Sequence, residues 1–137
     1  MSDVKPTFQV SVVASDVDAS IDFYRLLGVP IPDEANWQSH HVGIPINGSD
    51  LDLDSLEMTK GYDDKWDGTG LILIMRVPTR DEVDVAYKRV VGAGHPGHLE
   101  PIDAFWGCRY AVVRDPDGNY IGIMSPQDES RSSAPPV

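Results

Sequence analysis

The sequence has one cysteine, no long hydrophobic run and few basic residues, and each shortage excludes a class of structure. Cys108 alone cannot form an internal disulfide, nor can it build a thiolate-based zinc site. The longest uncharged apolar run, residues 71–75, is far too short to cross a bilayer. The N-terminus lacks the basic and then apolar layout of a signal peptide, so we expect a cytoplasmic protein with no membrane partner.

Basic residues are half as numerous as acidic ones. Eleven Lys and Arg against 22 Asp and Glu give a formal net charge of −11 in a chain of 137 residues. Such a surface repels nucleic acid and attracts cations, so we expect no nucleic-acid partner. The negative charge either attracts a cationic ligand or contributes only to solubility.

The first half of the chain begins with a strand and a helix. Residues 8–12 alternate apolar and polar, which predicts a strand whose apolar side chains, Phe8 among them, face the core. Ser15 or Asp16 then caps a helix with apolar residues at helical spacing, and Gly28 ends it.

Two short strands follow this helix. Residues 40–46 and 51–54 both alternate, and Asn47-Gly48 between them is a strong hairpin signal. Residues 55–69 read as an irregular connection.

The second half repeats this order. A strand over residues 71–77 precedes a capping box formed by Thr79 and Glu82, which opens a second amphipathic helix. Further on, residues 115–119 (Asp-Pro-Asp-Gly-Asn) predict a tight turn between two alternating runs, and hence a hairpin. Residues 127–137 are polar and rich in Ser and Pro, and we expect a disordered tail there.

The internal repeat organises the fold prediction. The helices start near Asp16 and Arg80, an offset of 64 residues. Each half offers one helix and one sheet with two unlike faces. The face that bears Gln9, Ser11 and His41, with the two aspartates at 52 and 54, is too polar for a dry core. Two such halves predict a cleft.

Two segments resemble signatures of the vicinal oxygen chelate superfamily, which includes glyoxalases, extradiol dioxygenases, epimerases and bleomycin resistance proteins. Residues 15–28 resemble its first-helix signature, and residues 115–122 resemble its last-strand signature. The resemblance covers residues 8–126. It implies an α+β fold with two βαβββ modules, cupped mixed eight-stranded sheets with helices on the outer face, and a homodimer.

The expected organisation is therefore a single domain over residues 1–137. Module one spans about 7–56, the connection 57–69, and module two about 70–126. Whether the modules pair within one chain or between chains stays open.

The resemblance also implies positions for metal ligands, one on each of four strands. In this chain they fall at Gln9, at Asp52 or Asp54, at Ile72 and at Gly122. Ile72 has no ligand atom, and Gly122 has no side chain where the metal enzymes usually carry glutamate. Because three protein ligands are the usual minimum for a catalytic site, we expect no metal and no other cofactor.

Aromatic residues lie in the predicted connections, where they could stack on a flat ligand. Trp37, Trp66, Phe105 and Trp106 are of this kind, with domain or dimer packing as the alternative. The candidate ligand-binding residues are Gln9, Trp37, His41, Asp52, Asp54, Trp66, Ile72, Phe105, Trp106, Tyr110, Tyr120, Gly122 and Met124.

Two functions fit this pattern best, and the sequence favours the first; it neither supports nor excludes a third, a metal-free enzyme that uses Arg or Tyr as acid–base groups. One is a small-molecule-binding protein of the bleomycin-resistance kind, which sequesters an aromatic or cationic ligand such as an antibiotic without chemistry. The other is a lyase, isomerase or dioxygenase with a displaced metal set, drawn from Gln9, His41 and Asp52 or Asp54. We name no catalytic residue.

Overall fold

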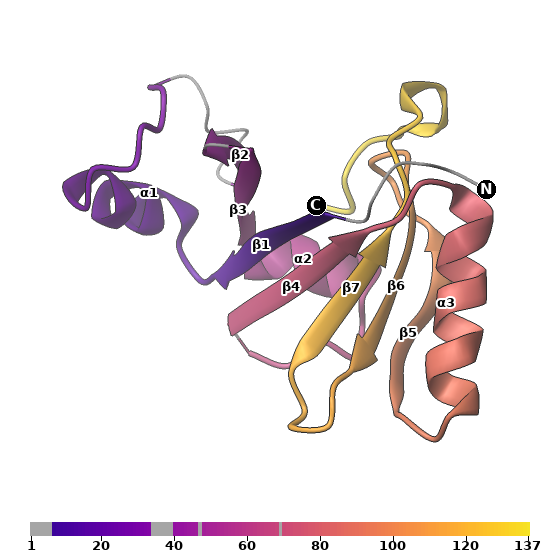
Figure 1. The fold of residues 1–137 in the computed structure, drawn as a ribbon. Helices are drawn as coiled ribbons and strands as arrows, with labels where there is room; N and C mark the ends of the chain where they lie inside the picture. Colours follow the sequence, from indigo (N-terminus) through magenta and orange to yellow (C-terminus); the bar gives the residue numbers. More distant parts are fainter. Residues whose placement is uncertain (1–6, 34–39, 47, 69) are drawn as a thin grey trace.

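The structure is a computed structural model that describes residues 7–33, 40–46, 48–68 and 70–137 (Figure 1). Its seven strands are β1 (Thr7–Ala14), β2 (His41–Ile46), β3 (Ser49–Ser55), β4 (Gly70–Arg76), β5 (Gly97–Asp103), β6 (Arg109–Arg114) and β7 (Tyr120–Met124). The helices are α1 (Val17–Leu26), α2 (Leu56–Tyr62) and α3 (Arg80–Gly92), and a short 3-10 helix, η1, spans Glu129–Arg131.

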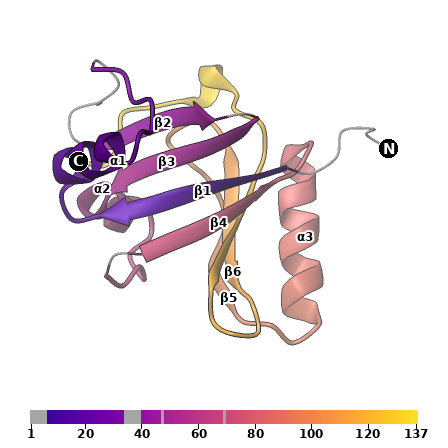
Figure 2. The same cartoon turned by 60° about the vertical axis from the view of Figure 1, so that its left-hand side comes forward.

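One mixed sheet contains all seven strands, in the order β2-β3-β1-β4-β7-β6-β5. In each module the first strand pairs in parallel with the last, as β1 with β3 and β4 with β7. The two modules meet where β1 and β4 pair antiparallel within the chain. Figure 2 shows β2, β3, β1 and β4 side by side in this continuous sheet. The predicted α+β class is confirmed.

The first module is shorter than predicted. It has three strands among the described residues, so the sheet has seven strands rather than eight. The segment after α1 contains Pro30 and Pro32, which lack the backbone N–H that a strand needs for pairing. The two prolines therefore explain why residues 28–33 form no strand.

Helices α1 and α3 pack on the same face of the sheet, near its two ends (Figure 1). Asp16 caps α1 by accepting a hydrogen bond from Ala19 N at 3.1 Å, and Thr79 caps α3 in the same way from Glu82 N at 3.3 Å. The buried residues of α1 contact apolar side chains of β2 and β3, while Val83 of α3 packs on β6 and β7. We call the opposite side of the sheet the inner face.

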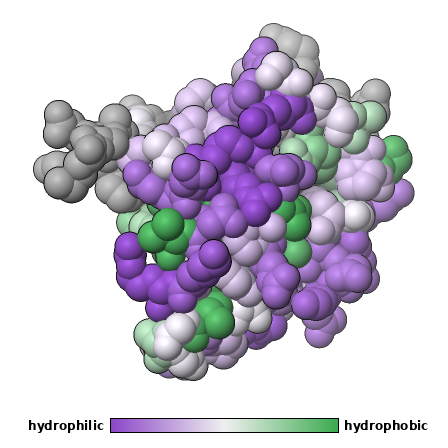
Figure 3. All heavy atoms as spheres, turned by 90° about the vertical axis from the view of Figure 1, so that its right-hand side faces the viewer, coloured by the Kyte–Doolittle hydropathy of each residue, from purple (hydrophilic) through white to green (hydrophobic). Residues whose placement is uncertain are grey.

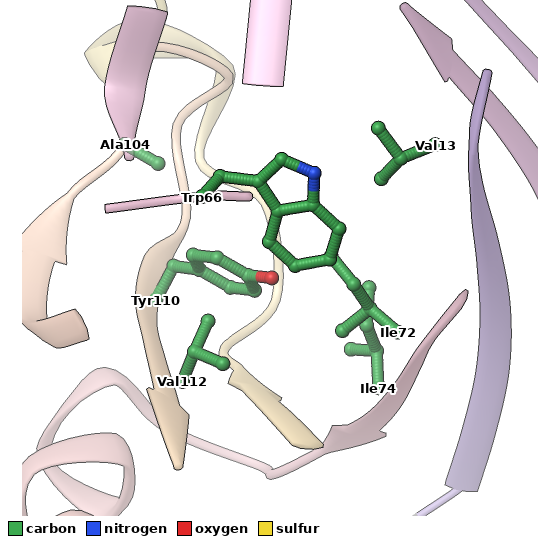
Figure 4. Close-up of a cluster of buried hydrophobic side chains, with 7 residues drawn as sticks. All are labelled: Val13, Trp66, Ile72, Ile74, Ala104, Tyr110 and Val112. Atoms are coloured by element: carbon green, nitrogen blue, oxygen red, sulfur yellow. The ribbon is translucent and has the colours of Figure 1, made fainter. Parts of the chain in front are cut away.

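Helix α2 lies on the inner face, although the sequence predicts an irregular connection for this segment. It follows β3 directly, because Ser55 Oγ accepts a hydrogen bond from Met58 N at 3.0 Å and so caps the new helix. The loop after α2 places Trp66 in a buried cluster with Ile72, Tyr110 and other apolar residues (Figure 4). Helices therefore lie on both faces of the sheet, and α2 with its loop covers part of the inner face.

The hairpin between β6 and β7 is confirmed. Asp115 Oδ1 accepts hydrogen bonds from Asp117 N at 3.0 Å and from Asn119 N at 2.8 Å. Gly118 supplies the positive φ of 85° that the turn needs.

The C-terminal tail, residues 127–137, differs from the expected disordered segment. Its backbone is tied to the loop between β5 and β6: Asp128 N donates to Gly107 O at 2.9 Å, and Ser133 N donates to Phe105 O at 2.8 Å. The tail therefore forms part of the wall around the inner face.

The other surfaces are mostly polar, with separate apolar areas. The side on which α3 lies is mainly hydrophilic (Figure 3). Phe8 is 51% exposed, so the prediction that it faces the core is wrong; the buried residues of β1 are Gln9, Ser11, Val13 and Ala14. Across the described residues no helix is both long enough and apolar enough to span a membrane.

Candidate functional site

A cavity of about 890 Å³ opens on the inner face. The sheet forms its floor, with side chains from β1, β2, β3, β4, β6 and β7. Helix α2, the loop between β5 and β6, and the C-terminal tail form its walls. This volume lies within the range of small-molecule sites, about 300–1,000 Å³.

A chain of hydrogen bonds crosses the floor of the cavity. Arg76 pairs with Asp50, and its Nε donates to Gln9 Oε1 at 2.6 Å. The amide of Gln9 is thereby oriented so that its Nε2 donates to Asp52 Oδ2, which also accepts from Ser11 Oγ at 3.4 Å. These contacts hold the Asp52 carboxylate in one orientation, and the charge of Arg76 is offset by Asp50 rather than by Asp52.

A histidine–aspartate pair lies beside this chain. His41 and Asp54 face each other across β2 and β3, and His41 Nδ1 is 2.6 Å from Asp54 Oδ1. The Asp54 side chain is only 12% exposed, whereas that of His41 is 41% exposed. Because a carboxylate accepts, Nδ1 carries the proton, and neutral His41 presents an unprotonated Nε2.

Burial and neighbouring charges shift the pKa values of Asp52 and His41. Burial raises the pKa of Asp52 to about 6, with further contributions from the charges of Asp54 and Asp50 and partial opposition from His41 and Ser11. Burial alone would lower the pKa of His41, but the hydrogen bond to Asp54 and the charges of Asp54 and Asp52 outweigh it and raise this pKa. The carboxyl of Asp52, with its pKa of about 6, therefore stays protonated to a higher pH than an exposed aspartate, and His41 likewise keeps its charge to a higher pH than a free imidazole.

An aromatic cluster forms the opposite wall. Trp106 is central: its ring centroid lies 5.0 Å from those of Tyr62 and Phe105 and 5.2 Å from that of Tyr110. The interplanar angles of 66–85° are the edge-to-face arrangement that aromatic pairs favour. Such a wall offers flat apolar surface to a planar ligand.

The positions implied for metal ligands do not fit a metal centre. Gln9 and Asp52 are hydrogen-bonded to each other, and Ile72 lines the cavity with an apolar side chain. At Gly122, a Cβ would lie 3.0 Å from Ile74 Cγ1 and 3.1 Å from the Tyr110 ring, so the tyrosine occupies the space a carboxylate would need. Within the described ranges, no group of three or more His, Cys, Asp or Glu side chains is placed to hold a metal ion.

Most of the predicted ligand-binding residues gather at the cavity. Those that line it are Gln9, His41, Asp52, Asp54, Ile72, Phe105, Trp106, Tyr110 and Met124. Trp66 and Tyr120 instead stack on each other with centroids 4.4 Å apart, outside the cavity lining, and Gly122 lies buried beneath Tyr110. Trp37 lies outside the described residues.

Several lining residues were missed. Arg76 shares a face with Ile72 and Ile74 at period two, so the alternation of β4 could have placed it in the cavity. Tyr62 was missed because α2 was not recognised. Ser132 and Ser133 reach the cavity only because the tail folds back on the β5–β6 loop, and no local pattern signals that contact.

Comparison with known proteins agrees with this fold. The family model of the Glyoxalase/Bleomycin resistance protein/Dioxygenase superfamily matches residues 8–123. An uncharacterized protein of Mycobacterium bovis is 30% identical over 135 residues, which cover 92% of this chain and 87% of that protein.

Solved structures share the fold at low sequence identity. A glyoxalase/bleomycin resistance protein/dioxygenase superfamily member from Vibrio splendidus superposes with a TM-score of 0.61 at 16% identity, covering 88% of this chain and 98% of that one. Methylmalonyl-CoA epimerase from Mycobacterium tuberculosis gives 0.56 at 19% identity, covering 89% and 88%. On the match to the family model, the chain belongs to the Glyoxalase/Bleomycin resistance protein/Dioxygenase superfamily.

Proposed function

We propose that this protein binds and sequesters a small molecule that combines a planar aromatic ring with a positively charged group, without metal chemistry. The observation that carries the proposal is the composition of the cavity: an aromatic wall around Trp106 faces a floor that contains the carboxylates of Asp52 and Asp54.

The aromatic wall supports binding of a flat ring. Trp106 and Phe105 are half-buried, so part of each ring remains open to the cavity. Edge-to-face contacts of Trp106 with Tyr62, Phe105 and Tyr110 hold both rings in place before any ligand arrives. A preorganised wall costs less conformational entropy on binding than one assembled around the ligand.

The charges on the floor support a cationic ligand. Arg76 is paired with Asp50, and His41 is bonded to Asp54, which leaves Asp52 without a basic partner of its own. A half-buried carboxylate of this kind favours a positively charged group or a hydrogen-bond donor. The net charge of −11 adds long-range attraction for cations.

Sequestration requires shape and charge but no activated water, so the poor fit to a metal site does not weaken the proposal. Binding of an antibiotic with this chemistry would be one use of such a cavity.

The test is isothermal titration calorimetry against planar cations, such as proflavine and 2-naphthylmethylamine, and neutral planar controls. We expect saturable one-to-one binding of the cations and weaker binding of the controls. A Trp106→Ala variant should lose affinity while keeping the far-UV circular dichroism spectrum of the folded protein. Absence of heat across the whole panel, from protein that unfolds cooperatively, would refute the proposal.

A further inference from the structure

Strand β2 contains a glycine that its backbone conformation does not require. Gly43 pairs with Asp52 in the middle of the β2–β3 ladder, and it is not among the glycines with positive φ. Glycine weakens the interior of a strand, because it has no side chain to pack and loses more entropy on folding. A reason for glycine at this position must therefore lie in the space around it.

That space lies between two polar groups of the cavity. A Cβ at position 43 would lie 3.3 Å from Asp52 Oδ1 and 3.7 Å from His41 Nε2. Both side chains line the cavity and share the inner face with Gly43. The missing side chain thus leaves a recess bounded by one carboxylate oxygen and one imidazole nitrogen.

Both atoms that face the recess are hydrogen-bond acceptors. Asp52 Oδ2 is engaged by Gln9 and Ser11, which leaves Oδ1 directed at the recess. In the neutral form of His41, which is the form that an ammonium group would meet, Asp54 holds the proton on Nδ1, so Nε2 offers a lone pair. Within the described part of the chain, neither Oδ1 nor Nε2 has a hydrogen-bond partner of its own.

We propose that the recess over Gly43 binds a primary ammonium group of the ligand, which donates one hydrogen bond to Asp52 Oδ1 and one to His41 Nε2. This inference deepens the proposed function and rests on it. It makes Gly43 a residue that determines specificity.

Other polar groups match the recess less well. An anion would meet two acceptors and a negative charge. A hydroxyl has one donor for two acceptors, and a quaternary ammonium has none. A primary ammonium has three N–H donors and the positive charge that the Asp52 carboxylate favours, and charge-assisted hydrogen bonds are about twice as strong as neutral ones.

The test measures binding of 2-naphthylmethylamine and of 2-naphthylmethanol, which differ only in the polar group, to wild-type protein and to Gly43→Ala at pH 8. The added methyl group should occupy the recess and lower the affinity for the amine about tenfold, in line with the loss of a hydrogen bond to a charged group. Affinity for the alcohol should change less than twofold.

Gly92→Ala is the matched control. Gly92 ends α3 on the surface, and a Cβ there meets no atom within 4 Å. It should leave the affinities for both probes unchanged. Unfolding in urea should show that Gly43→Ala remains cooperatively folded, because the better strand propensity of alanine offsets the close contact of 3.3 Å with Asp52 Oδ1.

The outcomes separate the two proposals. If wild-type protein binds the amine and Gly43→Ala binds it equally well, the ammonium recess is refuted while the proposed function stands. If the wild type binds neither probe nor any other planar cation, both are refuted. Equal affinity of the wild type for the amine and the alcohol would also refute the proposal that the recess binds an ammonium group.

Discussion

Replacing Gly122 by alanine should destabilise the protein, because the Tyr110 ring already occupies the space above this glycine. The new Cβ would lie 3.0 Å from Ile74 Cγ1 and 3.1 Å from both Cε1 and Oη of Tyr110. Ordinary contacts of a Cβ begin at 3.4 Å, so these neighbours must move by several tenths of an ångström. Tyr110 is 1% exposed and Ile74 is 5% exposed, which leaves them little room to yield. Overpacking of this kind costs about 1–3 kcal/mol.

Urea unfolding followed by tryptophan fluorescence measures this loss. Gly92→Ala serves as the control, because both substitutions reduce the entropy of the unfolded chain alike, and only position 122 adds contacts. The cost of Gly122→Ala should shrink when Tyr110 is replaced by valine, since the two sites are in contact. If Gly122→Ala is as stable as the wild type, or costs the same with and without the tyrosine ring, then Tyr110 does not fill this space.

Three further predictions follow from individual contacts. Because the pKa of Asp52 is raised to about 6, folded protein holds a proton between about pH 4 and pH 6 that unfolded protein has released, so stability falls as pH rises through this window. Asp52→Asn should flatten that fall in urea midpoints measured across the window, and an unchanged profile would contradict the assigned shift. His98→Leu removes the partner of the buried Asp63 carboxylate, 2.7 Å from His98 Nε2, and should cost roughly 3–5 kcal/mol in urea unfolding; a cost below 1 kcal/mol would show that the pair is not formed. Gly107 has φ of 90° and a close approach to Asp128 O, so Gly107→Ala should release the C-terminal tail and make it a faster target for trypsin at 131, whereas unchanged cleavage would place the tail elsewhere.

The sequence predicted the parts of the fold that depend on local chemistry. Asp16 and Thr79 are helix caps because their side chains accept from the third residue of the helix, which is a short-range rule. The Asp115 turn is local for the same reason. The alternation in β1, β2 and β3 correctly placed Gln9 and His41 on one face, because successive side chains of a regular strand point to opposite faces.

The features that the sequence did not predict depend on distant partners. Helix α2 lies in a segment with two glycines and no long apolar stripe, and its burial against the sheet stabilises it. Trp66 lies in a loop, as predicted, but its packing against Ile72 and Tyr110 across the inner face depends on strands distant in the sequence (Figure 4). The tail is held by backbone hydrogen bonds to the β5–β6 loop, and the pattern of side chains in the sequence does not predict such bonds.

The candidate site likewise has features that the sequence predicted and features that depend on distant partners. The alternation placed Asp52 and Asp54 in the cavity, whereas the link from Asp50 through Arg76 and Gln9 to Asp52 joins three different strands. That link depends on the pairing of β1 with both β3 and β4, which no single segment of the sequence reveals.

The most direct test of the account is a crystal structure of the protein with 2-naphthylmethylamine. We expect the ring against Trp106 and the ammonium nitrogen within hydrogen-bonding distance of Asp52 Oδ1 and His41 Nε2, above Gly43. A ligand seated with its ammonium in solvent, or bound on the opposite face of the sheet, would contradict the central claim that the inner face is an aromatic cavity with an acidic floor for cationic ligands.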